Sequence, residues 1–488
     1  MKSVLRSTGM LSASTGVTIL AGLASAKAWA ILVGTNGVGY MGLLLSLLGL
    51  ISLVAGLGVS TGLVRFGASA IAESQAANVA ALRRAAWLIT LATGAVALPL
   101  LIASRGPISE VALGGTAYQN SVPIIGVALV LGMVSGVQTG ILNAYHKVGA
   151  LARYGVLVAV LGTVAEVPFI WIWRSSGVPF AILATAAVAC IISSTLLWRE
   201  MPKSQVTVEW EAVRAQAGQL LRFGGPYTVS MIVGTGVLLA MPLLVLHIVG
   251  PSSVGAYRAA AVIGVTYLGF LLAAMSQDYF PRVSAAGSSR EDLLRLVNEQ
   301  QRLVMLLATP VILGALALAP IIVPLLYSQS FAPASNVLEW QLIGDVFRLS
   351  SWTLSFVILA RSSSHTFLAV EAIGGAAILL ASWLAMSRFG VAGAGMGYLG
   401  GYIIYFAAVW LVLRRQIGFR LTSTNAYLLV AVIGAVTLVR LLPLLGDEAA
   451  RLPVGLLLAL SFGAYSLQQI SRETGLWRRP LAAQAGSG

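Results

Sequence analysis

Five of the charged side chains within the long apolar stretches of this 488-residue chain are candidates for a functional site. Three are cations, Lys27, Arg258 and Arg348, and two are acids, Glu166 and Asp345. A charge at the centre of a hydrophobic helix costs about 2.5–3.5 kcal/mol on insertion scales, so such residues mark binding sites for substrates or ions. The cations, with Asp345 beside Arg348, suit an anionic substrate, because charge-assisted hydrogen bonds to phosphate are stronger than neutral ones. Glu166 and Asp345 are candidates to couple transport to protons or sodium ions.

Several of these charges also have a structural interpretation. Arg258 lies near the end of its apolar stretch, where a long side chain can extend to the lipid headgroups. Asp345 and Arg348 are three residues apart on one helix face, so they can neutralise each other. Glu166 has no obvious partner nearby, whereas Glu371, toward a helix end, can pair with a neighbouring arginine.

Other motifs give little indication of chemistry. Two GxGxxG matches occur, at Gly37–Gly42 and Gly395–Gly400, but neither has the preceding strand and βαβ unit of a dinucleotide site. We interpret both as glycines that cap helices or allow close helix packing. None of the four lysines follows a glycine, the three histidines form no HExxH, and there is one cysteine. We therefore expect no catalytic site, no metal site and no cofactor.

The composition predicts a membrane protein. Only 9% of the residues are charged and 58% are apolar, whereas a soluble chain carries about 25% charged residues. Lipid cannot satisfy exposed backbone groups, and apolar runs of about 20 residues match helices that cross a bilayer. The net charge of +14 comes from basic residues at the ends of these runs, where they orient the protein rather than bind nucleic acid.

The hydropathy pattern predicts about fourteen transmembrane helices. Of the basic residues, 22 fall on one predicted side, 5 on the other and 3 within the spans, which places both termini in the cytoplasm. The five on the outer side are Arg105, Arg174, Arg388, Arg440 and Arg451. The predicted spans are 8–33, 38–64, 86–104, 122–144, 151–173, 178–198, 223–249, 254–280, 302–327, 336–360, 366–387, 394–413, 426–445 and 453–470.

An internal repeat divides the chain. Residues 5–39 align with 221–255 without a gap at eleven identities, which include the pairs Gly34/Gly250 and Gly39/Gly255. A repeat of six helices returns the chain to the same side, so it predicts two parallel lobes. The predicted organisation is an all-α protein with an N-lobe at 1–200, a cytoplasmic linker at 201–222, a C-lobe at 223–415 and an extra helix pair with a tail at 416–488.

Several short stretches have a familiar form. They are Ala26-Lys27-Ala28, Val33-Gly34, Val38-Gly39, Tyr279-Phe280-Pro281 and Trp340-Gln341-Leu342-Ile343-Gly344-Asp345. With them, the chain resembles the multidrug/oligosaccharidyl-lipid/polysaccharide exporter superfamily, and within it the Wzx-type flippases of O-antigen and enterobacterial common antigen units. Arg348 and Glu371 fall where that family has a cation and a glutamate. The resemblance covers about residues 1–415. The pair 426–470 departs from it, since Wzx proteins usually have twelve helices and murein-lipid flippases fourteen.

The resemblance implies a flippase of the bacterial inner membrane that moves an undecaprenyl-diphosphate-linked oligosaccharide to the outer leaflet. The expected partners are this glycan lipid, the membrane lipids, a polysaccharide polymerase and a chain-length regulator. The alternatives are a cation-coupled drug antiporter of the same superfamily and a membrane enzyme such as a polymerase or ligase. The cations at 27, 258 and 348 favour an anionic substrate over the antiporter, and the short outer loops argue against the enzyme.

Overall fold

The computed structural model describes residues 2–201, 208–285, 289–361 and 364–474. Every regular element in this part of the chain is helical, which confirms the predicted all-α fold. The helices pack into two compact units. The first extends to Arg258 and includes Leu325–Phe331, and the second holds Ala259–Pro324 and the residues from Ala332 onward.

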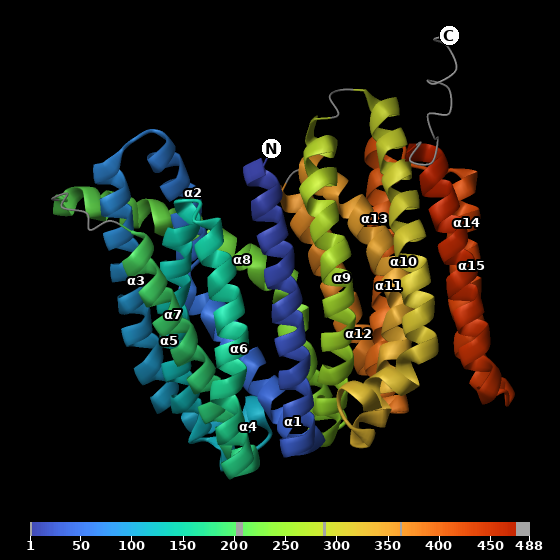
Figure 1. Ribbon diagram of the computed structural model, residues 1–488, viewed down its shortest axis with the longest axis horizontal. Coiled ribbons are helices and arrows are strands. Elements are labelled where there is room, and N and C mark those ends of the chain that lie inside the picture. The colour runs from blue at the N-terminus through green and yellow to red at the C-terminus, as the bar shows by residue number, and fades with distance from the viewer. Residues whose placement is uncertain (1, 202–207, 286–288, 362–363, 475–488) are drawn as a thin grey trace, which may run out of the picture. The chain divides into compact units, whose positions relative to one another are not determined.

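The first unit contains the N-terminal helices (Figure 1). They are α1 (Lys2–Gly56), α2 (Val59–Ala72), α3 (Ala76–Ala103), α4 (Arg105–Leu113), α5 (Ser121–Ala144), α6 (Val148–Trp173), α7 (Val178–Glu200) and α8 (Trp210–Ile248). Apolar side chains of α2, α3 and α5–α8 form its buried core, including Leu63, Leu82 and Leu142. The predicted linker, residues 201–222, is helical from Trp210 onward, because α8 begins at this residue.

The second unit contains most of the remaining helices. They are α9 (Pro251–Ala285), whose first turns belong to the first unit, α10 (Arg290–Leu326), α11 (Ala332–Arg361), α12 (Ser364–Phe389), α13 (Ala392–Ile417), α14 (Ser423–Leu441) and α15 (Glu448–Thr474). Side chains of α9–α13 form its core around Tyr279, Val357 and Val409. The repeat predicted that the second lobe begins with the span 223–249, which is part of α8, whereas α8 belongs to the first compact unit. The division into two six-helix lobes stays a prediction.

The helices are long and apolar enough to cross a membrane. Eleven described segments meet this condition, and two of them, Gly16–Gly56 and Val148–Glu200, each overlap two predicted spans. Helix α9 coincides with the one further predicted span, 254–280. Large apolar side chains such as Leu20, Val96 and Leu460 are more than half exposed on these helices, as expected for surfaces that contact lipid.

Gly34 divides helix α1 at the boundary between the first two predicted spans. Its backbone has φ 66° and ψ −168°, outside the helical region, and glycine adopts such angles without a side-chain clash. Just beyond the bend, α1 contacts the start of α9 through the glycines of the repeat. A Cβ on Gly39 would lie 2.9 Å from the nitrogen of Gly255, and one on Gly255 would overlap the backbone oxygen of Thr35. The predicted role of glycine in close packing is confirmed here.

A buried ion cluster fastens the C-terminal helix pair within the second unit. Glu339 of α11 pairs with Arg440 of α14 at 3.1 Å and with Arg451 of α15 at 2.6 Å. All three residues are at least nine-tenths buried. The placement of Arg440 and Arg451 on the outer side stays a prediction, and in the structure both guanidinium groups turn inward to a carboxylate more than 100 residues away.

Candidate substrate-binding site

Lys27 lies in the first half of α1, seven residues before the bend at Gly34. Its Nζ donates to the backbone oxygens of Leu325 and Tyr327, both at 2.8 Å. The ammonium group has three donors, so one remains for another acceptor. Among the described residues no carboxylate pairs with Lys27, and carbonyls alone therefore hold this cation.

Arg258 lies near the start of α9, and its side chain crosses α1 at Gly42. A Cβ at Gly42 would lie 2.6 Å from Cδ of Arg258, so only glycine leaves room for this path. The Nε atom is buried without a hydrogen-bond partner. Within the described ranges Arg258 forms no ion pair, and the ionisable side chains near it are the phenols of Tyr257 and Tyr327. A buried cation without a counter-charge is costly, which makes Arg258 a strong candidate to bind an anion.

Lys27 and Arg258 therefore converge on the same short segment around Tyr327. They are 231 positions apart in the sequence, yet both belong to the first unit together with Leu325–Phe331. Their assignment to opposite lobes, which the repeat suggested, stays a prediction. The two cations come to one segment because α1 and α9 approach closely at Gly39 and Gly255, which brings the beginning of α9 against α1.

Arg348 and Asp345 form a network with Tyr398 in the second unit. The Tyr398 hydroxyl donates to Oδ1 of Asp345 at 2.6 Å and accepts from Nη1 of Arg348 at 3.0 Å. The direct ion pair between Arg348 and Asp345 is longer, 3.8 Å. Gly344 makes the approach possible, since a Cβ there would lie 2.6 Å from the Tyr398 ring. Asp345 is almost fully buried, and it therefore orients Arg348 through the tyrosine as well as by charge.

Two tyrosines of this network were not predicted from the sequence. Tyr398 bridges the charged pair, and the Arg348 guanidinium lies 5.9 Å from the centroid of the Tyr402 ring. The signal that could have found them is their spacing. Tyr398, Tyr402 and Tyr405 recur at helical intervals on α13, beside the glycines of the second GxGxxG match.

Glu166 and Glu371 accept hydrogen bonds from neutral side chains and form no ion pair with a described residue. Glu166 of α6 accepts from Ser25 of α1 and, at 3.4 Å, from Thr185 of α7. Glu371 of α12 accepts from Ser355 at 3.1 Å and from the Tyr405 hydroxyl. The predicted pairing of Glu371 with a neighbouring arginine was wrong.

The five predicted site residues thus fall into three places. Lys27 and Arg258 lie together in the first unit, Glu166 lies elsewhere in that unit, and Asp345 with Arg348 lies in the second. A ring of all three cations stays a prediction. No group of three or more His, Cys, Asp or Glu that could hold a metal occurs in the described ranges.

The fold defines a polytopic membrane protein with cations in the interior of its helical units. Residues 12–336 match the family described as "Polysaccharide biosynthesis protein", and the chain belongs to this family. It is 25% identical over 422 residues to the lipid III flippases of Escherichia coli (strain K12) and Shigella flexneri, across 83% of this chain and 97% of each relative.

Solved structures share the fold. The lipid II flippase MurJ in an inward closed conformation has a TM-score of 0.71 at 13% identity, over 95% of this chain and 99% of that one. An inward-facing multidrug resistance MATE transporter of the MOP superfamily has a TM-score of 0.69 at 16% identity, over 82% and 94%. The resemblance to this superfamily is confirmed. Since 71 of the 488 residues follow Ile417, the 95% coverage requires that the MurJ match extends into the C-terminal helix pair.

Proposed function

We propose that this protein is a flippase that moves an undecaprenyl-diphosphate-linked oligosaccharide from the cytoplasmic to the periplasmic leaflet of a bacterial inner membrane. The product would serve the synthesis of a cell-surface polysaccharide. The observation that carries the proposal is the convergence of Lys27 and Arg258 on one segment without a carboxylate among the described residues. Family membership and the likeness to lipid III flippases support it.

The chemistry of the substrate explains why cations are needed. A diphosphate carries negative charges that cannot enter hydrocarbon unshielded, whereas a polyprenyl chain can remain in lipid. Lys27 retains a free donor, and Arg258 presents a guanidinium group that can bind phosphate oxygens in bidentate fashion. Arg348, held by Asp345 and Tyr398, is the third cation of the proposed site. Rocking of one lobe against the other would expose the site to each leaflet in turn.

Coupling and partners complete the proposal. Glu166, which accepts hydrogen bonds from Ser25, Trp29 and Thr185 and forms no ion pair with a described residue, is the proposed coupling site for protons or sodium ions, with Asp345 as the second candidate. Both termini face the cytoplasm, as the basic residues indicate. A polysaccharide polymerase and a chain-length regulator would receive the translocated unit.

A cation-coupled drug antiporter is the second candidate function, because the MATE transporter shares the fold. Fold alone does not determine function. The sequence relatives across 83% of the chain are flippases of a lipid, and the interior cations suit an anionic cargo. Drug efflux without any effect on glycan export would favour the antiporter.

Export of a surface glycan in a strain that lacks its lipid III flippase tests the proposal. The wild-type protein should restore export, and Lys27→Ala/Arg348→Ala should lose it by about tenfold or more, because charge-assisted contacts to the diphosphate disappear. Arg388→Ala, which removes an exposed cation at the end of α12, is the matched control and should export normally. Membrane insertion is measured for every variant. Normal export by the Lys27→Ala/Arg348→Ala variant would remove the substrate-binding role of these cations.

A further inference from the structure

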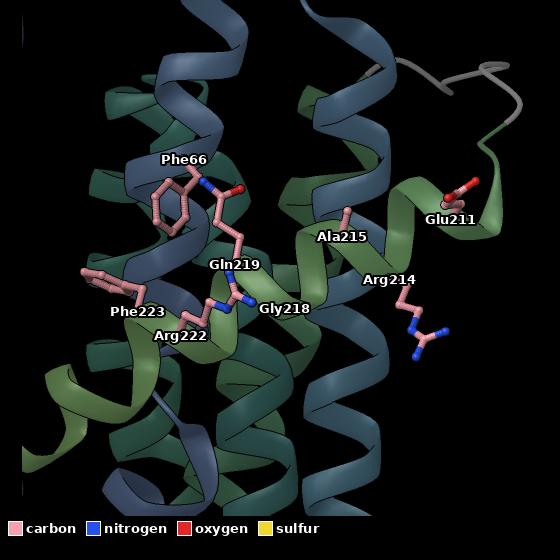
Figure 2. Close-up of a pocket in the computed structure, with 8 residues that line it drawn as sticks. All are labelled: Phe66, Glu211, Arg214, Ala215, Gly218, Gln219, Arg222 and Phe223. Carbon is pink, nitrogen blue, oxygen red and sulfur yellow. The ribbon is translucent and has the colours of Figure 1, made fainter.

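A basic pocket of about 810 Å³ lies in the first unit, between α2 and the first turns of α8. Figure 2 shows this part of α8 running across the neighbouring helices, with Phe66 of α2 above Phe223 of α8. Arg214 and Arg222 line the pocket together with Gln219. The site is separate from Lys27 and Arg258, and the proposed transport cycle does not use it.

Arg214 and Arg222 lie on the same face of α8, with Gly218 halfway between them. Residues at positions i, i+4 and i+8 align on a helix, and eight residues span about 12 Å. Nothing lies within 4 Å of the place where a Cβ of Gly218 would stand. Glycine therefore leaves an open space between two guanidinium groups, and the long arginine side chains can reach into it from both ends.

The pocket has an excess of positive charge and an aromatic wall. Among the described residues, neither Arg214 nor Arg222 forms an ion pair. Glu211 is the acid in the lining, and Figure 2 shows it at the far end of the segment from Arg222. A third cation, Arg65, stacks on the aromatic wall, 5.6 Å from the centroid of the Phe66 ring and 5.3 Å from that of Phe223.

The position of the pocket on α8 suits a membrane surface. The predicted span 223–249 starts where the pocket ends, so the arginines precede the hydrocarbon-spanning part of α8 and Phe223 begins it. Trp210, at the start of α8, is 69% exposed, and Trp198, near the end of α7, is 82% exposed. Exposed tryptophans of this kind are typical of the headgroup layer of a bilayer.

We propose that this pocket binds the phosphate-bearing headgroup of a lipid, with Arg214 and Arg222 on the phosphate and the Phe66–Phe223 wall against the first carbons of the chain. Two sources have this chemistry, a polyprenyl diphosphate and an anionic phospholipid. With the first source, the pocket is a loading site for the substrate and so rests on the proposed function. With the second, it anchors α8 to the membrane surface.

Binding of farnesyl diphosphate to the full-length protein in phosphatidylcholine nanodiscs tests the proposal. The Lys27→Ala/Arg348→Ala background removes two cations of the other proposed site. In this background, Arg214→Gln/Arg222→Gln should weaken binding by about tenfold or more. Gly218→Leu keeps every charge, favours the helix and fills the pocket, so it should weaken binding as well. Arg414→Gln/Arg415→Gln, which removes two exposed arginines from the end of α13, should leave the affinity within about twofold, because surface charges alone contribute little.

A second set of nanodiscs, with phosphatidylglycerol added, distinguishes the two sources. Competition by phosphatidylglycerol in the background protein, lost in Arg214→Gln/Arg222→Gln, assigns the pocket to anionic headgroups in general. Absence of competition, with farnesyl diphosphate still bound, assigns it to diphosphates. Equal affinity in the background protein and Arg214→Gln/Arg222→Gln would overturn the proposal, as would binding that Gly218→Leu leaves unchanged. This assay measures binding and not export. Its result therefore does not depend on whether the transport proposal holds.

Discussion

Replacing Glu339 with glutamine should strongly destabilise the second unit, because it leaves two buried guanidinium groups without their shared carboxylate. Breaking a buried ion pair by removing one partner costs about 3–5 kcal/mol. The side chains are only 5–10% exposed, so solvent screens the loss little. Arg440 keeps its hydrogen bond to Asn336 and Arg451 keeps its bond to the Leu316 oxygen, both at 2.7 Å. We therefore expect a loss near the lower end of that range, about 3 kcal/mol.

The free energy of unfolding is measured in mixed micelles by denaturing-detergent titration, with tryptophan fluorescence as the signal. Glu299→Gln is the matched control, since this exposed acid lies 4.0 Å from Arg295 and such pairs contribute about 0–1 kcal/mol. Glu339→Leu/Arg440→Met/Arg451→Met removes all three charges together and should stay within about 1 kcal/mol of the wild type. A loss below about 1 kcal/mol for Glu339→Gln would refute the reasoning, as would a triple variant no more stable than the single one.

Three further outcomes are expected. Gly255→Ala should cost about 1–3 kcal/mol of stability, because its Cβ would meet backbone atoms of α1. Gly269→Ala on the same helix has open space around its Cβ and should be neutral. Equal thermal unfolding temperatures of the two variants would contradict this expectation. Tyr398→Phe should lower export while the protein still inserts, since Arg348 loses its bridge to the carboxylate, and unchanged export would show that the bridge is dispensable. Glu166→Gln should abolish the dependence of transport on the ion gradient in vesicles, and a wild-type protein indifferent to the gradient would remove this coupling hypothesis.

The sequence by itself determined the fold class and the helices. Hydropathy is a local property, and in lipid an apolar run of sufficient length has to form a helix, since no water satisfies its backbone. The repeat aligns Gly39 with Gly255, and the structure packs these two residues against each other. The interior charges at Lys27, Arg258 and Arg348 were also visible, because charges stand out in apolar runs.

Only the tertiary structure decided which groups these charges meet. The partners of Lys27 are carbonyls about 300 positions away, the bridge between Asp345 and Arg348 comes from Tyr398, and Arg440 turns inward to Glu339. Hydropathy gave no partner for Arg440 and Arg451, because it compares each residue only with its neighbours in the chain. A buried charge is stabilised by whatever group helix packing brings beside it, and that packing depends on shape complementarity between helices far apart in the sequence.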